Sequence, residues 1–131
     1  MKSTDNNLPP SGLSEKDLRW NKFLEEVCFK KLEELNDIQK TAVLAFWYYT
    51  EMNSGGHTGY FDCYPETNSR LLTDALIAVG APEIANNYQQ AIAHGEEDDY
   101  IKNDDVFGDL EPAFSKNLMD YVELHRDMIF S

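Results

Sequence analysis

The stretch at residues 41–52 most constrains the fold, because it is apolar on nearly every side. Asn36 precedes it as an N-cap, and Gln39 completes a capping box. This cap and a length of about 16 residues favour a helix, since buried strands usually have five or six residues. A helix that is apolar all round is covered by its neighbours. We therefore predict a buried central helix that ends at residues 53–57, where glycines permit left-handed conformations.

Amphipathic helix patterns flank this stretch on both sides. Ser14, with Asp17 in capping-box position, predicts a helix whose apolar residues follow three-and-four spacing as far as Leu35. Two further helices are expected at residues 68–79 and 82–95.

Pro112 follows an acidic stretch and suits the first turn of a helix, so we expect the last helix to open there. No segment alternates with period two for long enough to make a sheet. The sequence therefore predicts an all-α, single compact domain of about five main helices around a buried central helix. This domain is expected to cover residues 13–131, after a disordered leader at residues 1–12.

The chain has 131 residues, which suits one domain with a core of its own. No apolar run approaches the roughly 18–20 residues that cross a bilayer, and the N-terminus lacks the pattern of a secretory signal. We therefore expect a cytoplasmic protein that does not enter a membrane. Cys28 and Cys63 are expected to be free thiols, as is usual in a reducing compartment.

The chain is strongly acidic, with 24 acidic and 11 basic residues and a net charge of −13. Such a charge repels phosphate backbones and attracts basic partners, so direct binding to nucleic acid is disfavoured. Residues 96–111 alone carry a net charge of −7, from eight acids and one lysine. We expect these acids to bind a partner as a patch that imitates spaced phosphates; they are Glu96, Glu97, Asp98, Asp99, Asp104, Asp105, Asp109 and Glu111.

Two other interpretations of the acidic stretch stay open. It could be a solvated loop that partly serves the dipole at the start of the last helix. A calcium site would also use such oxygen donors, but the ligand spacing and terminal glutamate of an EF-hand are missing.

The sequence contains no catalytic signature, so we predict no catalytic residue, no metal ligand and no cofactor. His-rich zinc and di-iron patterns, phosphate-binding glycine loops and the nucleophile elbow of hydrolases are all missing. The alternative is a small-molecule- or metal-binding protein, and with it an enzyme, with a site at the turn of residues 53–62. His57, Tyr60 and Asp62 would form that site. A structural or immunity-type partner is a third interpretation.

Residues 50–61, with the sequence TEMNSGGHTGYF, resemble the E-x-x-N-G-G-F-x-Q-Y-F signature of a bacterial family related to DNA mimic protein 19. The apolar helix before this signature is also similar, as are residues 78–81 (AVGA) and 87–91 (NYQQA) after it. The chain has His57 and Gly59 where the signature has Phe and Gln. Much of this family has no assigned function.

The resemblance implies an all-α fold and, for at least one relative, a dimer whose surface acids imitate duplex DNA and sequester a DNA-binding transcription factor. We therefore expect an acidic protein-interaction module, in its specific form a DNA mimic, with a basic protein such as a DNA-binding regulator as partner and a homodimer as an option. The signature itself is interpreted as a structural turn. Glu51 and Asn53 would satisfy backbone groups, the glycines would permit the turn and the aromatic residues would dock it; these residues are Gly55, Gly56, Tyr60 and Phe61.

Overall fold

The computed structural model describes residues 14–131, and within that range it contains helices and no strand. The all-α class is therefore confirmed, while the leader expected at residues 1–12 lies outside the described residues. The α-helices are α2 (Glu15–Lys22), α3 (Asp37–Cys63), α4 (Ser69–Ala78), α5 (Pro82–His94), α6 (Ile101–Leu124) and α7 (Arg126–Ile129). Three short segments join them: η2 (Phe23–Val27), a π-helical turn, and the 3₁₀ turns η3 (Leu32–Glu34) and η4 (Gly95–Asp98).

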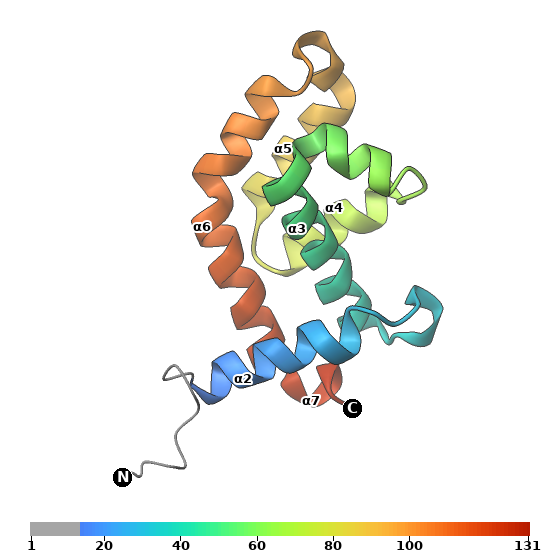
Figure 1. Ribbon diagram of the computed structural model, residues 1–131, viewed down its shortest axis with the longest axis vertical. Coiled ribbons are helices and arrows are strands. Elements are labelled where there is room, and N and C mark those ends of the chain that lie inside the picture. The colour runs from blue at the N-terminus through green and yellow to red at the C-terminus, as the bar shows by residue number, and fades with distance from the viewer. Residues whose placement is uncertain (1–13) are drawn as a thin grey trace.

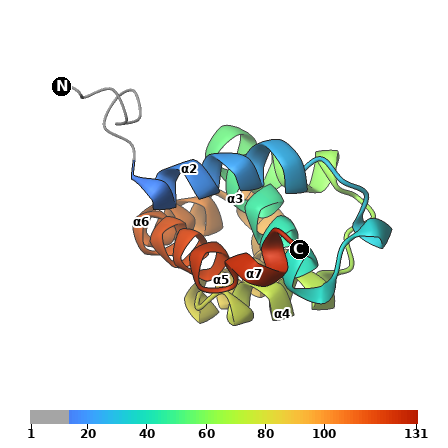
Figure 2. The same ribbon diagram turned by 90° about the horizontal axis from the view of Figure 1, so that it is seen from below.

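The helices pack around α3, which runs through the middle of the molecule (Figure 1). Helix α6 lies beside it, and α4 and α5 pack against α3 and α6 respectively. Seen from below, α2 lies on one side of α3 and α6, while α4 and α5 lie on the opposite side (Figure 2). Helix α2 crosses the lower end of the molecule in Figure 1, whereas η4 turns the chain from α5 into α6 at the upper end.

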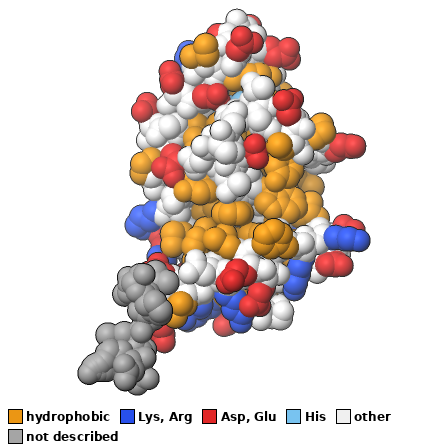
Figure 3. Space-filling model, in the orientation of Figure 1, with side chains coloured by type: hydrophobic (Ala, Val, Ile, Leu, Met, Phe, Trp, Pro, Cys, Tyr) orange, Lys and Arg blue, Asp and Glu red, His pale blue; other side chains and the backbone are white. Residues whose placement is uncertain are grey.

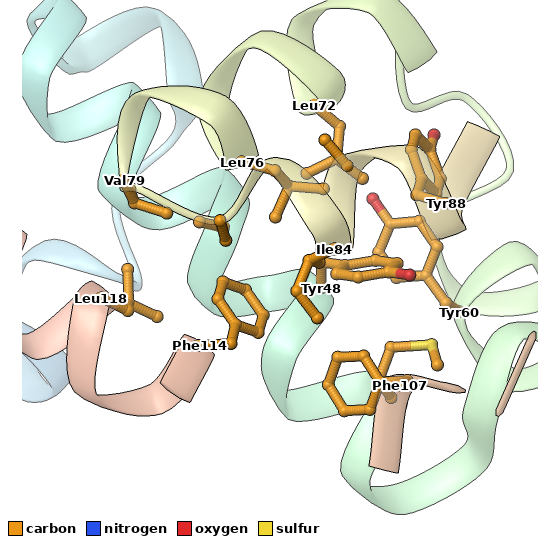
Figure 4. Packing of buried hydrophobic residues seen from close by; sticks show 14 residues of the cluster. Tyr48, Tyr60, Leu72, Leu76, Val79, Ile84, Tyr88, Phe107, Phe114 and Leu118 are labelled. Carbon is orange, nitrogen blue, oxygen red and sulfur yellow. The ribbon is translucent and has the colours of Figure 1, made fainter. Parts of the chain in front are cut away.

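The predicted central helix is confirmed, because several side chains of α3 have no exposed surface at all. The capping box of Asn36 and Gln39 forms as expected and starts this helix. Tyr48 is the centre of the core, where its ring meets Tyr60 and Tyr88 edge to face at centroid distances of 5.0 and 5.3 Å (Figure 4). Such edge-to-face pairs stabilise beyond the burial of their apolar area.

The first helix is shorter than predicted. Ser14 and Asp17 form the expected capping box, but α2 continues through the π-helical η2 only as far as Val27, and the chain then reverses through η3 before α3 begins. Contacts distant in sequence decide this difference: Asn36 and Gln39 donate hydrogen bonds to backbone oxygens near the C-terminus, at 3.0 and 2.8 Å. The chain must reverse to bring the start of α3 there, so the apolar spacing that continues to Leu35 does not continue one helix.

The end predicted for the central helix at residues 53–57 is a kink instead. Gly56 has φ +63° and ψ −164°, which interrupts the helical backbone, and α3 then resumes as far as Cys63. Glycine takes this left-handed φ without the cost that a Cβ would add. The expected break is therefore at the right place, and the short helical turn expected after it, at residues 59–65, is the last part of α3 rather than a separate element.

The acidic stretch is helical rather than a loop, and the expected start of the last helix at Pro112 is wrong. Helix α6 begins at Ile101 and includes Pro112 in its interior. A proline inside a helix costs about 3 kcal/mol through its missing N–H and its steric clash. Burial of Phe107, Phe114 and Leu118 on one face of α6 offsets that cost, since each is at most 3% exposed.

Both cysteines are free, as expected: Cys28 is buried and Cys63 is exposed. Burial raises the pKa of the Cys28 thiol to about 12, which removes its thiolate at neutral pH. No helix within residues 14–131 combines the length and apolar character needed to cross a membrane.

The candidate functional site

The signature turn (residues 50–61) and the acidic stretch at residues 96–111, which we name the acidic segment, were predicted as separate features but meet at the kink of α3. Asp104 of α6 reaches the kink, and its Oδ1 accepts hydrogen bonds from the backbone N–H of His57 at 3.0 Å and from its ring Nδ1 at 2.7 Å. A Cβ at position 56 would overlap the Asp104 carboxylate. Gly56 therefore provides both the backbone conformation and the space that this carboxylate needs.

His57 connects this carboxylate to the core. Its Nε2 lies 2.7 Å from the hydroxyl of Tyr48. Because the Asp104 carboxylate accepts a hydrogen bond from Nδ1–H, the Nε2 of the neutral ring is free to accept a hydrogen bond from the Tyr48 hydroxyl. His57 and Tyr48 are both 0% exposed, whereas the Asp104 side chain is 38% exposed. Desolvation lowers the pKa of His57, although the Asp104 carboxylate opposes that shift. The arrangement is a buried structural connection between α3 and α6.

The turn between η4 and α6 is also fixed to α3. Asp99 and Tyr100 have φ values of 55° and 65°, and the Tyr100 ring lies where a Cβ of Gly95 would be. That ring stacks on His57 and packs against Phe61, at centroid distances of 6.0 and 5.4 Å. We name the contacts among Gly56, His57, Phe61, Tyr100 and Asp104 the hub. The hub gives the acidic segment a defined conformation.

Four of the eight predicted partner-binding acids already have partners within the chain. Asp104 belongs to the hub, and Glu111 accepts a hydrogen bond from the Tyr49 hydroxyl at 2.9 Å. Asp98 accepts the backbone N–H of Lys102 at the start of α6, and Glu97 lies 3.1 Å from the ring of His94. The other four are exposed and form no side-chain hydrogen bond or ion pair with residues 14–131; we name them the free acids, Glu96, Asp99, Asp105 and Asp109.

The remaining signature residues hold the kinked helix together. Asn53 donates from its amide to the Tyr49 backbone oxygen at 3.1 Å, as expected. The Glu51 carboxylate instead faces Ser54, whose hydroxyl lies 3.4 Å away, and passes over Gly55 and Gly59. A Cβ at Gly55 or Gly59 would come within 3.3 or 3.1 Å of Glu51 Oε1, so these glycines leave room for the carboxylate.

The three residues of the alternative site at this turn differ in burial. His57 and Tyr60 are buried, whereas Asp62 is exposed, and the Tyr60 hydroxyl donates to Thr67 at 3.2 Å. Two grooves lie elsewhere on the described chain: one of about 1090 Å³ between α5 and α6, and one of about 470 Å³ beside Trp47 and Leu71. None of the three turn residues lines either groove. Residues 14–131 also bring together no group of three or more His, Cys, Asp or Glu side chains that would hold a metal ion.

Charge is distributed unequally between the two ends of the molecule. Residues 41–115, which include most of α3, all of α4, α5 and η4 and the first part of α6, contain 13 acidic and two basic residues. Their net charge is −11 out of −13, so the rest of the chain is nearly neutral. On the face shown in Figure 3, Lys and Arg gather in the lower half, while acidic side chains predominate in the upper half. We name the end formed by η4 and residues 101–111 of α6 the acid-rich end. The balanced end is formed by α2, the last turns of α6 and α7.

The family comparison covers both parts of the site. The model of the DMP19-like protein family matches residues 33–127, nearly three quarters of the chain. The chain belongs to the DMP19-like family. The match includes α3 to α6, and with them the hub and the whole acidic segment, while α2 lies outside it. No curated protein and no solved structure matches the chain.

Proposed function

We propose that this DMP19-like protein is a non-catalytic interaction module whose acid-rich end binds a basic, nucleic-acid-binding protein by imitating the charge of DNA. The observation that supports the proposal is the set of free acids on a scaffold of fixed conformation. Glu96 and Asp99 lie at the η4 turn, and Asp105 and Asp109 lie one helical turn apart on α6. The family resemblance to DNA mimics supports the same function.

Fixed carboxylates suit this function for a physical reason. Asp105 and Asp109 are separated by a helical rise of roughly 6 Å, which is shorter than the Debye length of about 8 Å at physiological salt. Their fields therefore add, and they raise the rate of encounter with a basic surface. Because the hub already orders the segment, binding does not require the entropy of ordering it. Carboxylates also offer Arg and Lys the charged acceptors that phosphates offer.

Further parts of the proposal follow from the chain as a whole. We place the protein in the cytoplasm, with a DNA-binding regulator as partner and without direct contact to nucleic acid, since the net charge of −13 repels phosphates. A homodimer is compatible with this function if the two copies meet through their balanced ends, where repulsion is weakest. The turn at residues 53–62 is not proposed as a ligand site, because His57 is buried in the hub and Tyr60 is buried in the core.

The experiment compares two variants that each remove four negative charges. One carries E96Q, D99N, D105N and D109N, and the control carries E25Q, E26Q, E33Q and E34Q, at exposed positions in η2 and η3. Each protein is used to capture partners from native lysate at low salt, and bound proteins are eluted with high salt. We expect basic nucleic-acid-binding proteins in the eluate, with affinity reduced at least roughly tenfold by the first variant and far less by the control.

A second step tests mimicry itself. A captured partner is mixed with the protein and with increasing duplex DNA, and the fraction bound to each is measured. If the acids occupy the DNA-binding surface of the partner, then DNA displaces the protein and the two never bind together. A ternary complex would contradict mimicry but leave the interaction intact. Equal binding by both four-charge variants, or an eluate not enriched in basic proteins, would contradict the proposed function.

A further inference from the structure

A groove of about 1090 Å³ lies between α5 and α6. It begins beside the acid-rich end, where Glu97 and Asp98 line it, and continues along both helices to Pro82 and Leu110. Neither the hub nor the free acids line this groove. The residues that line it therefore differ from the free acids that support the function proposed above.

Two buried asparagines form the floor of the groove. Asn87 and Asn103 are 4% and 9% exposed and line it together. The Asn103 Nδ2 donates to Asn87 Oδ1 at 2.9 Å, and the Asn87 Nδ2 donates to the backbone oxygen of Asn103 at 2.8 Å. The Asn103 Oδ1 accepts no hydrogen bond from residues 14–131.

We infer that this oxygen faces the groove. In the described part of the chain, every side-chain nitrogen or oxygen that is sealed from solvent has a hydrogen-bond partner. The Asn103 Oδ1 has none, so solvent reaches it, and the groove is the cavity that Asn103 lines. A nine-tenths buried side chain thus presents an unused acceptor at the floor, which calls for a ligand that donates hydrogen bonds.

The walls of the groove add negative charge and apolar surface. Glu83, Glu97 and Asp98 contribute carboxylates, against one lysine, Lys102, and the ring of His94, which lies beside Glu97. Val106 and Leu110 contribute apolar side chains from α6. A cation with several donors and an apolar stem matches this lining. Among side chains, arginine fits best, because its planar guanidinium has five donors while the ammonium of lysine is a compact charge with three.

We propose that the groove between α5 and α6 binds the guanidinium group of an arginine side chain. The floor acceptor of Asn103 and the wall carboxylates bind the donors, while Val106 and Leu110 pack against the methylene stem. This proposal rests on the proposed function in one respect only: the arginine belongs to the basic partner. It gives the interaction a specific contact in addition to the general field of the acid-rich end.

The direct test titrates the ¹⁵N-labelled full chain with N-acetyl-arginine N-methylamide and follows amide shifts and heat of binding. The matching citrulline compound has the same shape without the charge, and the lysine compound has the charge without the planar donors. We expect shifts along α5 and α6 with the arginine probe, several-fold weaker binding of the lysine probe and none of the citrulline probe. Absence of shifts in the groove, or equal binding of arginine and citrulline probes, would overturn the proposal.

Matched variants separate the groove from the general field. E83Q with E97Q removes two carboxylates from the groove, and E25Q with E26Q removes two exposed carboxylates elsewhere. We expect about a tenfold loss of arginine binding for the first pair and less than about a twofold loss for the second. Asn86→Trp fills the groove without changing its charge and should abolish binding. Equal effects of both double variants would assign binding to net charge and overturn the proposal.

Two further comparisons are needed. The first shows whether the guanidinium belongs to a protein side chain or to a free small molecule, and the second separates failure of the groove proposal from failure of the proposed function. Free arginine that binds much more tightly than the capped probe would indicate a small-molecule site and overturn the assignment to a protein side chain. If the capped probe fails to bind while the variant without free acids still loses its partner, the proposed function stands and the groove proposal fails. If the capped probe binds but no basic protein is captured, the groove proposal stands alone.

Discussion

Asp120 and Glu123 of α6 lie beside Lys16 and Arg19 of α2, whereas the acids at the other end of the same helix lie beside one another. At the balanced end, Lys116 adds a second cation to Asp120 at 2.6 Å. Hydrogen bonds from Lys116 and Lys16 lower the pKa of Asp120, and the bond from Arg19 does the same for Glu123. Opposite charges therefore help to hold α2 on α6.

At the acid-rich end, like charges oppose folding, and the hub holds the structure together. Aromatic stacking of Tyr100 and the Asp104–His57–Tyr48 hydrogen bonds replace the ion pairs found at the other end. The comparison shows that neighbouring acids can have opposite roles. Asp104 points into the hub and accepts hydrogen bonds from His57, while Asp105 is exposed and is one of the free acids proposed to bind a partner.

The largest effect on this comparison should come from Gly56→Ala. The new Cβ would overlap the Asp104 carboxylate, and the alanine would have to adopt a φ of +63°, which is unfavourable for a residue with a Cβ. The hub must therefore open. We expect a loss of about 3 kcal/mol in the free energy of unfolding, measured by urea denaturation. The control is Gly108→Ala, also in a helix, where a Cβ meets nothing within 4 Å. That control should gain roughly 0.5–1 kcal/mol, because alanine has the higher helix propensity.

An unfolding free energy of Gly56→Ala as high as that of Gly108→Ala would show that the hub contributes nothing to the acid-rich end. If the hub holds the acid-rich end in its conformation, then amide hydrogen exchange in Gly56→Ala should become faster first at the η4 turn and in the first turns of α6. Protection at the balanced end should change less, since its ion pairs do not involve α3.

Two substitutions at adjacent residues, Asp104→Asn and Asp105→Asn, compare an acid of the hub with a free acid. Both remove one negative charge, but only Asp104 accepts hydrogen bonds from His57. We expect Asp104→Asn to lose about 2 kcal/mol of unfolding free energy, the scale of a hydrogen bond to a charged group. Asp105→Asn should stay within about 0.5 kcal/mol of the native chain, as is usual for exposed sites.

Partner binding should show the reverse order. At a temperature where both variants are folded, Asp105→Asn should weaken capture of the basic partner more than Asp104→Asn does. Circular dichroism checks the fold, and the same binding measurement serves for both proteins. Equal unfolding free energies for the two variants would mean that Asp104 has no special structural role.

Local signals made much of the fold predictable. The capping boxes at Ser14 and Asn36 form as the sequence indicates, because an N-cap depends only on residues three positions apart. The central helix follows from its own composition. The start of α6 was predicted wrongly, because the acidic residues and Pro112 indicated a loop followed by a new helix. A weaker helical pattern precedes Pro112 and continues after it. Its residues share one helical face and are all buried; they are Asn103, Phe107, Phe114 and Leu118.

The site was predictable in composition but not in orientation. The acidic segment and the signature turn were both recognised, yet nothing local shows that Asp104 contacts a residue 47 positions away. Helical geometry would have narrowed the prediction, since Asp104 and Glu111 are seven residues apart and so share a face. That face turns toward α3, and Asp105 and Asp109, four apart, share another. Assigning helix to this stretch would therefore have separated structural acids from free ones.

The smallest expected effect concerns pH and tests whether His57 is neutral in the hub. Burial lowers its pKa in the folded state, while the unfolded chain titrates near pH 6.5. The unfolded state therefore binds the proton first as pH falls, and stability is present above about pH 6.5 and declines below it. The decline is at most about 1.4 kcal/mol per pH unit, the limit for one proton. Between pH 6.5 and 5, His57→Gln should flatten this dependence of the unfolding free energy, and the exposed control His94→Gln should retain it. If His57→Gln does not fold, the NMR chemical shifts of the His57 ring carbons in the native chain show whether the ring is protonated. A ring that is already protonated at pH 6.5 would mean that the Asp104 carboxylate affects the pKa more than burial does. The contact between His57 and Asp104 would then be an ion pair like those of the balanced end.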